Sequence, residues 1–440
     1  MNNKKFFELA AKKGISASEL SLLEEHSLSI GLFHSAIDNY SLSDSKKIIA
    51  RGIYNDKFGM VTSEVDNKET PDFLVDEIID IAKVIEKDDK AIIFKGSKKY
   101  SKRNAYNKAL EGVSIDKKLV TLYAIEKKIK EFDKRVSEIE EVSYSESSNT
   151  EQLLNSYGLK LKQKSNLFTY SASVVVKDGD ETKTGYYVFF DNDPKKFDID
   201  LFVKKVVEDG TTKLHGIKCP SKKYKTVLGP KAAASLVGFY LSSASSEEIQ
   251  KQSSFLVGKL NAKVASSKLT VSENPLARNL FCRYFDDEGV ATYKKTIIEK
   301  GVLKTYLYNL ETAAREKRET TGNGYRESGK IGIDTVNLCV RSGKKSEEEM
   351  IASLKEGVYI TRLMGLHAGI NSQSGNFSLQ AEGFIIVDGK IDKPLSMMTV
   401  AGNLLEMFEG VQGVANNSEL MPSSITSPSI LVKSLVITSE

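Results

Sequence analysis

The sequence is poor in the residues that build small local sites. It contains no tryptophan, and only three cysteines and four histidines in 440 residues. Cys219, Cys282 and Cys339 are odd in number and widely separated, which excludes a disulfide framework and a C-x-x-C metal site. We therefore interpret the cysteines as buried thiols.

The histidines are also too dispersed to form a local zinc motif. No pair has the H-x-x-x-H or H-x-x-H spacing that places two imidazoles on one face of a helix. A metal site would therefore need ligands from distant segments. The four histidines are His26, His34, His215 and His367.

Long apolar segments are missing as well. No apolar run approaches the roughly 20 residues that a membrane-spanning helix needs. Residues 1–7 lead into neither the apolar segment nor the small-residue cleavage site of a signal peptide. We expect a cytoplasmic protein with no membrane partner.

Neither sign of charge is in large excess. The chain has 63 Lys and Arg against 59 Asp and Glu, a formal net charge of +4, so its overall field does not favour nucleic acid. Residues 95–103 are a local exception, with five basic residues and a tyrosine within nine positions. This segment could bind phosphate or form a solvated loop, and we favour the loop because the pattern does not recur. Direct nucleic-acid binding is therefore not expected.

The apolar pattern predicts an α+β fold. The chain is too long for one ordinary core, and 40% hydrophobic residues are enough for two or three domains. Tight turns are expected at Asn55-Asp56 and Asp178-Gly179-Asp180, between antiparallel strands. The expected helices cover residues 6–13, 71–85, 116–136, 127–141 and 199–207, and the expected strands residues 19–24, 28–33, 47–54, 57–62, 171–177 and 184–190.

A break in the pattern at Cys219-Pro220-Ser221 predicts a domain boundary. We place an N-terminal domain of antiparallel sheet with helices at residues 1–219. The C-terminal domain, residues 220–440, is expected to contain curved antiparallel sheets with a few helices. Its first elements should be a strand at 224–228 and a helix that begins at Pro230.

The most informative segment, residues 365–417, is rich in glycine. Short strands alternate there with turns, Asp388-Gly389 suits a two-residue hairpin loop, and Asn403 is placed to cap a helix at 404–408. A strand, a glycine turn and a helix N-terminus can together form a binding cleft. The alternative, which spacing alone favours, is a curved sheet edge with glycines at bulges.

From Gly375 onward the sequence is G-N-F-S-L-x-A-x-G-F-x-x-x-x-G-K-I-x-x-P-x-x-x-x-T-V-A-G-N-L. This order resembles the C-terminal signature of the TldD/PmbA family, also known as peptidase U62 or "modulator of DNA gyrase", and specifically its PmbA branch, called TldE. The D-D-E-G-V run at 286–290 and the T-G-N loop at 321–323 resemble the family too. The resemblance extends from about Thr226 to the C-terminus, whereas the N-terminal half matches only in its order of strands and helices.

The same resemblance implies that this chain lacks the family's metal site. In the TldD branch, a helix carries H-E-x-x-x-H, whose histidines bind metal and whose glutamate activates water. The corresponding positions are Pro230, Lys231 and Ser235, which cannot replace imidazole ligands and a carboxylate base. Residues 417–428 also lack the cysteines that TldD-like chains have there. We expect no metal or other cofactor in this chain, and zinc in a TldD-type partner.

The resemblance implies a non-catalytic TldE/PmbA-like subunit of a TldD/TldE-type metalloprotease that hydrolyses extended or unfolded peptides. Its partner would be a metal-bearing TldD-like subunit in a heterodimer, or a second copy in the absence of that subunit. A glycine-rich sheet edge can bind an extended peptide through backbone groups alone. A side chain added at Gly375 or Gly383 should obstruct this cleft more than it harms folding. The residues predicted to line the cleft are Gly322, Asn323, Gly375, Asn376, Gly383, Gly402 and Asn403.

Two other functions stay open at this point. One is a regulator associated with DNA gyrase or nucleic acid, as the family's historical label suggests. The other is a self-sufficient hydrolase that uses a thiol and imidazole pair, formed by His367 with Cys282 or Cys339. Such a hydrolase could instead use Asp286, Asp287 and Glu288 as cation ligands or as general acid and base. For these three acids we favour a solvated turn that holds basic side chains.

Overall fold

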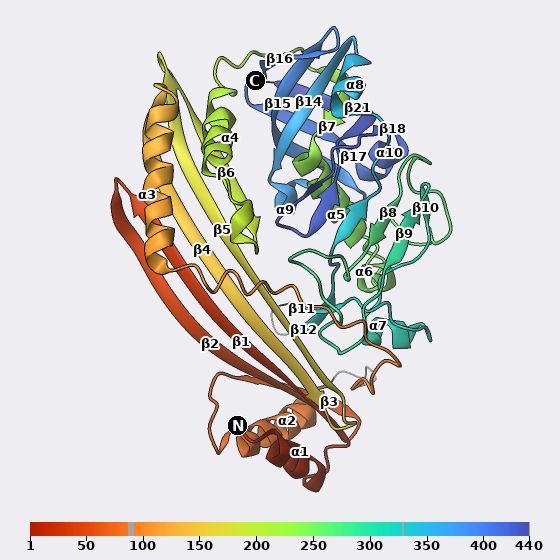
Figure 1. The fold of residues 1–440 in the computed structure, drawn as a ribbon. Coiled ribbons are helices and arrows are strands. Elements are labelled where there is room, and N and C mark those ends of the chain that lie inside the picture. The colour runs from red at the N-terminus through yellow and green to blue at the C-terminus, as the bar shows by residue number, and fades with distance from the viewer. Residues whose placement is uncertain (87–91, 328–329, 440) are drawn as a thin grey trace.

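The computed structural model describes residues 1–86, 92–327 and 330–439. It has a long, curved sheet in the N-terminal half and a closed barrel with smaller sheets in the C-terminal half (Figure 1). Most strand pairs are antiparallel, which confirms the predicted α+β fold with curved antiparallel sheets. The domain boundary at residues 219 and 220 stays a prediction.

The N-terminal sheet has the strand order β3-β2-β1-β4-β5-β6, and each neighbouring pair is antiparallel. The predicted turn at Asn55-Asp56 is confirmed, with φ angles of 50° and 61° between β2 and β3. The predicted hairpin at Gly179, with a φ of 59°, joins β5 to β6. The strands are β1 (Ala17–Phe33), β2 (Ala36–Tyr54), β3 (Lys57–Ser63), β4 (Val136–Asn155), β5 (Lys160–Asp178) and β6 (Glu181–Asp191).

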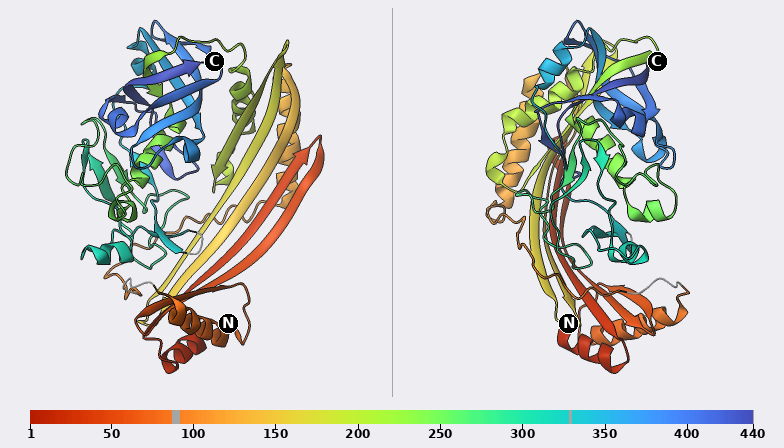
Figure 2. Two further views of the ribbon diagram at one scale, coloured as in Figure 1. Left: turned by 180° about the vertical axis from the view of Figure 1, so that it is seen from behind. Right: turned by 90° about the vertical axis from the view of Figure 1, so that its right-hand side faces the viewer.

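Alternating side chains of the central strands pack against other elements on both faces of this sheet. On one face, Tyr144 and Phe168 pack with α3 and α4, while α1 and α2 cover the same face nearer the N-terminus. On the opposite face, Leu153 and Leu161 pack against Tyr284 of the C-terminal half. Figure 2 shows this arrangement edge-on in its right-hand view. The helices are α1 (Asn3–Lys12), α2 (Thr70–Val84), α3 (Ile115–Phe132) and α4 (Ile199–Thr211), with a short 3-10 helix η1 (Pro194–Lys196) before α4.

The C-terminal half is built around the barrel. Its strands follow the order β14-β7-β21-β17-β15, and pairing of β15 with β14 closes the ring. Helix α5 follows β7 directly, and its apolar side chains join the core formed by the barrel strands. The barrel and its attached strands are β7 (Lys222–Leu228), β14 (Glu356–Met364), β15 (Asn376–Val387), β16 (Lys390–Pro394), β17 (Met398–Asn403), β18 (Val411–Val414) and β21 (Ile430–Ser439).

A smaller sheet, in the order β10-β9-β8-β13-β20-β19, and the β11–β12 ribbon complete this half. Hairpin turns occur at Lys300-Gly301 and at the predicted Asp388-Gly389, all four residues having positive φ. These strands are β8 (Val271–Glu273), β9 (Lys295–Glu299), β10 (Val302–Leu303), β11 (Gly324–Glu327), β12 (Lys330–Ile333), β13 (Leu338–Val340), β19 (Glu419–Leu420) and β20 (Ile425–Ser427). The helices are α5 (Pro230–Ser242), α6 (Ser246–Gln250), α7 (Leu310–Arg315), α8 (Glu347–Ala352), α9 (Leu366–Gly369) and α10 (Leu404–Glu409).

Some predicted elements were wrong. Residues 19–33 and 376–387 each form one continuous strand, because pairing with neighbours on both sides continues through the positions predicted as breaks. The helix predicted at 116–136 ends at Phe132. The second helical segment, predicted at 127–141, is interrupted because Asp133 is extended and β4 begins at Val136.

Candidate functional site

The positions predicted to correspond to a metal site lie at the start of α5. Gly229 is the N-cap residue, and Pro230 occupies the first turn, where its missing N–H disrupts no helical hydrogen bond. Ser235 Oγ donates to the Lys231 carbonyl oxygen at 3.0 Å, so this hydroxyl is engaged by the helix backbone. Desolvation, and then the positive charge of Arg362, lower the pKa of Lys231. The start of α5 therefore presents a basic side chain whose charged form is disfavoured by its surroundings.

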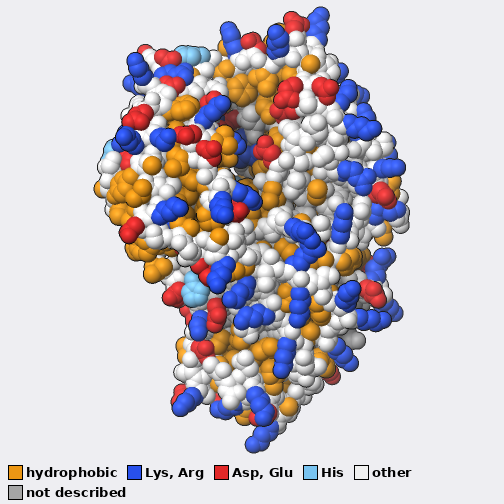
Figure 3. Space-filling model, in the orientation of Figure 1, with side chains coloured by type: hydrophobic (Ala, Val, Ile, Leu, Met, Phe, Trp, Pro, Cys, Tyr) orange, Lys and Arg blue, Asp and Glu red, His pale blue; other side chains and the backbone are white. Residues whose placement is uncertain are grey.

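Charged side chains near the start of α5 act on the pKa of Lys231, and they also pair with one another. Lys213 Nζ lies 2.8 Å from Asp209 Oδ2 on α4 and 3.2 Å from Glu382 Oε2 on β15. Arg362 Nη1 on β14 lies 4.0 Å from the same Glu382 oxygen. Figure 3 shows a hollow between α4 and the barrel, with charged side chains of both signs around it. Three cations therefore meet two carboxylates here.

Metal-ligating side chains do not gather in the described part of the chain. Among residues 1–86, 92–327 and 330–439, no three His, Cys, Asp or Glu side chains could hold a metal ion together. That this chain binds no metal, and that a partner binds zinc, both stay predictions.

The thiol and imidazole pair of the alternative hydrolase is not formed between Cys282 and His367. Cys282 is buried, which raises the pKa of its thiol and disfavours the reactive thiolate. His367 is exposed on α9, and no hydrogen bond joins it to Cys282 within the described residues. The prediction of buried thiols is confirmed for Cys219 and Cys282, whereas Cys339 is half-buried.

The acidic run at residues 286–288 is buried, so the predicted solvated turn was wrong. Arg283 Nη2 lies 2.6 Å from Asp287 Oδ1 and 2.7 Å from Glu151 Oε2 on β4. The Arg326 backbone N–H donates to Asp287 Oδ2 at 2.7 Å, and its side chain donates to Ser21 Oγ on β1 at 2.6 Å. Arg283 and Arg326, from two separate segments, therefore compensate the acidic charge that is buried between the two halves of the chain.

The three carboxyls have different proton affinities. Burial raises the pKa of Asp286 to about 7. Burial, and then the charge of Asp286, raise the pKa of Glu288 to about 8. Burial acts in the same direction on Asp287, but Arg283 and Arg326 outweigh it and lower the pKa of this carboxyl to about 2. Asp287 is therefore the carboxylate of an ion-pair network, and the other two are held mostly protonated below pH 7.

Gly375, Asn376 and Asn403 come together at one edge of the barrel. Asn376 and Asn403 face each other across β15 and β17, and Asn403 Nδ2 donates to Asn376 Oδ1 at 2.9 Å. Asn403 Nδ2 also donates to the Ser374 carbonyl at 2.8 Å, while Asn403 Oδ1 accepts from the Leu405 N–H at 3.0 Å. This confirms the predicted N-cap of α10. Gly375 has a φ of 75°, which suits glycine at this turn.

Gly402 and Gly383 lie at positions of close packing. A Cβ at Gly402 would lie 3.1 Å from the Phe377 ring. A Cβ at Gly383 would lie 2.1 Å from the Tyr359 carbonyl oxygen of the neighbouring strand. The adjoining backbone occupies that space, which argues against the expectation that a side chain at Gly383 harms folding less than it obstructs the cleft.

Gly322 and Asn323 lie in a third place, in the loop before β11. Asn323 is fully buried, and its Nδ2 donates to both carboxylate oxygens of Glu273 at 3.0 Å. Lys295 forms an ion pair with the same carboxylate at 2.5 Å. The predicted cleft residues thus occupy three separate places, and a role for them in substrate binding stays a prediction.

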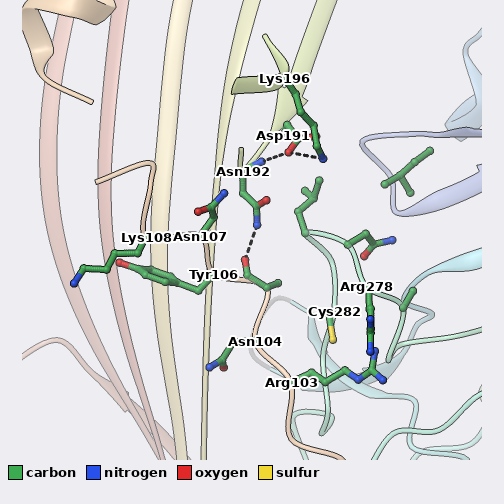
Figure 4. Close-up of a pocket in the computed structure, with 15 residues that line it drawn as sticks. Arg103, Asn104, Tyr106, Asn107, Lys108, Asp191, Asn192, Lys196, Arg278 and Cys282 are labelled. Atoms are coloured by element: carbon green, nitrogen blue, oxygen red, sulfur yellow. Dashed lines mark hydrogen bonds and ion pairs between the residues drawn. The ribbon is translucent and has the colours of Figure 1, made fainter. Parts of the chain in front are cut away.

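Two adjacent cavities lie between the N-terminal sheet and residues 277–283. Their volumes are about 610 and 320 Å³, and they share Leu280 and Cys282. Residues 103–108 form one wall of the larger cavity, where Ala105 pairs with Ser165 of β5 beyond the end of β6 (Figure 4). The smaller cavity lies against β4 and β5. Sequence reasoning missed this cleft because its walls come from distant segments, and its only sequence signal was the basic run that ends at Arg103.

Two family models match most of the chain. The PmbA/TldA metallopeptidase central domain matches residues 108–214, and the PmbA/TldA metallopeptidase C-terminal domain matches residues 221–439. The chain belongs to the PmbA/TldD family. The predicted resemblance is therefore confirmed, and it includes much of the N-terminal half, where the sequence had offered only an order of elements.

Curated relatives of this PmbA/TldD chain are named metalloproteases. A metalloprotease PmbA homologue of Buchnera aphidicola is 30% identical over 298 residues, which cover 66% of this chain and 64% of the relative. The match thus spans just under two thirds of that protein. A metalloprotease of Methanocaldococcus jannaschii is 27% identical over 401 residues, covering 87% of this chain and 86% of the relative. These names support a peptidase role for the family.

Solved structures share the whole fold. A Thermotoga maritima protein described as a candidate modulator of a DNA gyrase superposes with a TM-score of 0.91 at 28% identity, covering 99% of both chains. TldE from Thermococcus kodakarensis gives a TM-score of 0.89 at 24% identity, again over 99% of both chains, and at that identity shows the fold alone. As for membranes, no helix within the described residues is long and apolar enough to cross one, and the cellular compartment stays a prediction.

Proposed function

We propose that this chain is the metal-free, TldE/PmbA-like subunit of a TldD/TldE-type peptidase. In this proposal the chain holds an extended or unfolded peptide while a metal-bearing TldD-type subunit hydrolyses it. Where no such subunit exists, two copies of this chain would form the assembly.

The start of α5 is the observation that carries the proposal. The positions that the resemblance assigns to the H-E-x-x-x-H motif hold Pro230, Lys231 and Ser235. Proline has no ligand atom, the ammonium of Lys231 repels a metal cation, and the Ser235 hydroxyl is engaged by the helix backbone. Nearby, Lys213 and Arg362 add further positive charge. The chemistry of this place fits an anionic or polar substrate group better than zinc.

The cleft between the two halves supports a role in peptide binding. Its two cavities adjoin one another along the N-terminal sheet, and their walls are rich in amide, hydroxyl and charged groups. An extended peptide needs such a long polar cleft, because each of its residues has a backbone donor and an acceptor to satisfy.

The edge of the N-terminal sheet offers a surface for a partner. Among the residues that the structure describes, residues 36–47 of β2 pair only with β1, since β3 covers β2 from Ile48 onward. All of these residues are exposed, including Ile37, Tyr40 and Leu42. A long unpaired edge with exposed apolar side chains is prone to add a strand from another chain, so we assign this edge to the TldD-type or second-copy partner.

The two alternatives have weaker support. Direct DNA binding is disfavoured by the near balance of 63 basic and 59 acidic residues. A self-sufficient hydrolase would need an activated thiol or free carboxylates, but the Cys282 pKa is raised and Asp287 is engaged by arginines.

Reconstitution tests the proposal. The purified chain, a homologue that retains H-E-x-x-x-H, and their mixture would each be assayed for hydrolysis of an unstructured peptide. We expect the mixture to hydrolyse the peptide much faster than either protein alone, and a variant with Ile37→Ser and Leu42→Ser to lose complex formation while keeping its melting temperature. Full hydrolysis by this chain alone would overturn the proposal.

A further inference from the structure

We propose that the larger cavity binds the C-terminal carboxylate of an extended peptide and that the smaller cavity binds the backbone amides that precede it. This inference rests on the proposed function, because it specifies which end of a peptide this chain recognises and where.

The larger cavity is lined by more basic than acidic side chains. Among its lining residues the basic side chains are Arg103, Lys108, Lys196 and Arg278, against one acid, Asp191. Asp191 is already engaged, because Lys196 Nζ lies 2.9 Å from it and the backbone N–H groups of the next two residues donate to it. In the described part of the chain, no carboxylate forms an ion pair with the other three cations.

Arg103 and Arg278 are the two guanidinium groups available to an anion. Arg103 donates to the backbone carbonyl of Leu276 at 3.0 Å, which leaves its charge unpaired. Within the described residues, Arg278 has neither a hydrogen-bond nor an ion-pair partner. In Figure 4 both side chains extend toward the same edge of the cavity. A planar guanidinium binds a carboxylate through two parallel hydrogen bonds, which suits the end of a peptide.

The smaller cavity is lined by side chains with buried hydrogen-bond acceptors and a buried donor that form no hydrogen bond in the described part of the chain. In the part of the chain that the structure describes, Gln163 Oε1, Glu151 Oε1 and Arg283 Nε are buried and lack hydrogen bonds. All three side chains line this cavity, and the Gln163 side chain is only 8% exposed. A buried polar atom without a partner is costly. Two acceptors and one donor match the N–H and C=O groups of a peptide backbone.

A peptide fits both cavities better than a nucleic acid does. A phosphodiester backbone has no N–H donors for the unpartnered oxygen atoms of Gln163 and Glu151. The larger cavity has one aromatic lining residue, Tyr106, whereas proteins that bind single-stranded nucleic acid stack successive bases on several aromatic side chains. Leu280 and Cys282, which both cavities share, give an apolar wall for a peptide side chain between the two polar ends.

The inference can be tested by peptide binding to the full chain and to its reconstituted complex. An N-terminally labelled, unstructured peptide would be compared with its C-terminal amide by fluorescence anisotropy. Loss of a charge-assisted hydrogen bond should weaken binding of the amide roughly tenfold to a hundredfold. Methylation of the nitrogen in the last two peptide bonds should weaken binding roughly two- to tenfold, through loss of N–H donors. Melting temperatures would be recorded for every variant.

Variants identify the cavity. Arg278→Gln and Arg103→Gln should reduce binding of the acid peptide to the level of the amide and leave amide binding unchanged. Lys195→Gln is the matched control, because Lys195 is an exposed cation close by that does not line the cavity. Inorganic phosphate should displace the acid peptide only at high concentration.

The outcomes separate this inference from the proposed function. Equal binding of acid and amide peptides, with no effect of either arginine variant, would overturn the carboxylate site and leave the peptidase proposal standing. Binding of an oligonucleotide or of inorganic phosphate in preference to every peptide would overturn it too. If no peptide binds and the reconstituted mixture also fails to hydrolyse peptides, both proposals fall.

Discussion

Arg283 joins the two halves of the molecule through Glu151, with 2.7 Å between Arg283 Nη2 and Glu151 Oε2 on β4. The same nitrogen lies 2.6 Å from Asp287 Oδ1, so one guanidinium neutralises a carboxylate from each half. Arg283 also lines the smaller cavity. The shape of the cleft therefore depends on how the N-terminal and C-terminal halves pack together.

We expect Arg283→Met to lower the free energy of unfolding by about 3 kcal/mol, since it leaves two largely buried carboxylates without their cation. Denaturant unfolding would measure the change. Lys128→Met is the control, because it breaks an exposed ion pair with Asp200 and should hardly change stability. An equally small effect of both substitutions would show that the network does not hold the halves together.

The melting temperature should fall as the pH rises from about 5 to 8. Glu288, with a folded pKa of about 8 against 4.5, and Asp286, with about 7 against 3.8, keep protons in the folded state that the unfolded chain has released. Between those values the folded state binds more protons, so increasing pH favours unfolding. Asp287 has the opposite sign, and its contribution is lost only as the pH falls from about 4 to 2.

Glu288→Gln should flatten this pH dependence, because glutamine cannot ionise and its side-chain oxygen can still accept from the Leu310 N–H. Calorimetric scans of both proteins across the pH range would provide the comparison. A slope that is unchanged in the variant, or a melting temperature that rises with pH in the natural chain, would contradict the assignment.

Three glycines should respond differently to alanine. Gly383→Ala should destabilise severely, because its Cβ would overlap the Tyr359 carbonyl. Gly375→Ala, with a φ of 75° and the Phe255 ring at 3.3 Å, should cost about 1 to 2 kcal/mol. Gly365→Ala, with a φ of 77° and open space around it, controls for backbone strain alone. Thermal melting would rank them, and similar losses at all three positions would show that the contact at Gly383 is relieved by movement of the strand.

Local signals in the sequence predicted the turns and caps better than the length of the strands. Asn55-Asp56, Asp388-Gly389 and the Asn403 cap are specified by short-range chemistry, and the structure confirms all three. The continuity of β1 and β15 depends on neighbouring strands that lie far away in sequence, so a local pattern could not reveal it.

The candidate site was harder to predict from the sequence than the turns and caps, because it too depends on contacts between distant segments. Three consecutive acids usually indicate solvent exposure, and only the tertiary fold brings Arg326 and Glu151 into contact with the loop of Asp287 and Arg283. Likewise Gln163 and Arg278 carry no motif, and they become candidate binding residues only because β5 and the 277–283 segment face each other across the cleft.

Duplex DNA should bind only weakly and without sequence preference. Opposite charges are nearly balanced over the chain, so any contact with phosphate should be lost near 200 mM salt, as expected for a few displaced counterions. Anisotropy titrations at increasing salt would measure this. A sub-micromolar complex that survives such salt would revive the gyrase-related alternative.

Zinc content tests the central claim most directly. After purification and mild dialysis, elemental analysis should find no stoichiometric zinc in this chain and zinc only in a partner that retains H-E-x-x-x-H, because Pro230, Lys231 and Ser235 supply neither ligands nor base. The account would be contradicted if this chain held one tightly bound zinc ion and hydrolysed peptides alone, and if a chelator removed both the zinc and the hydrolysis.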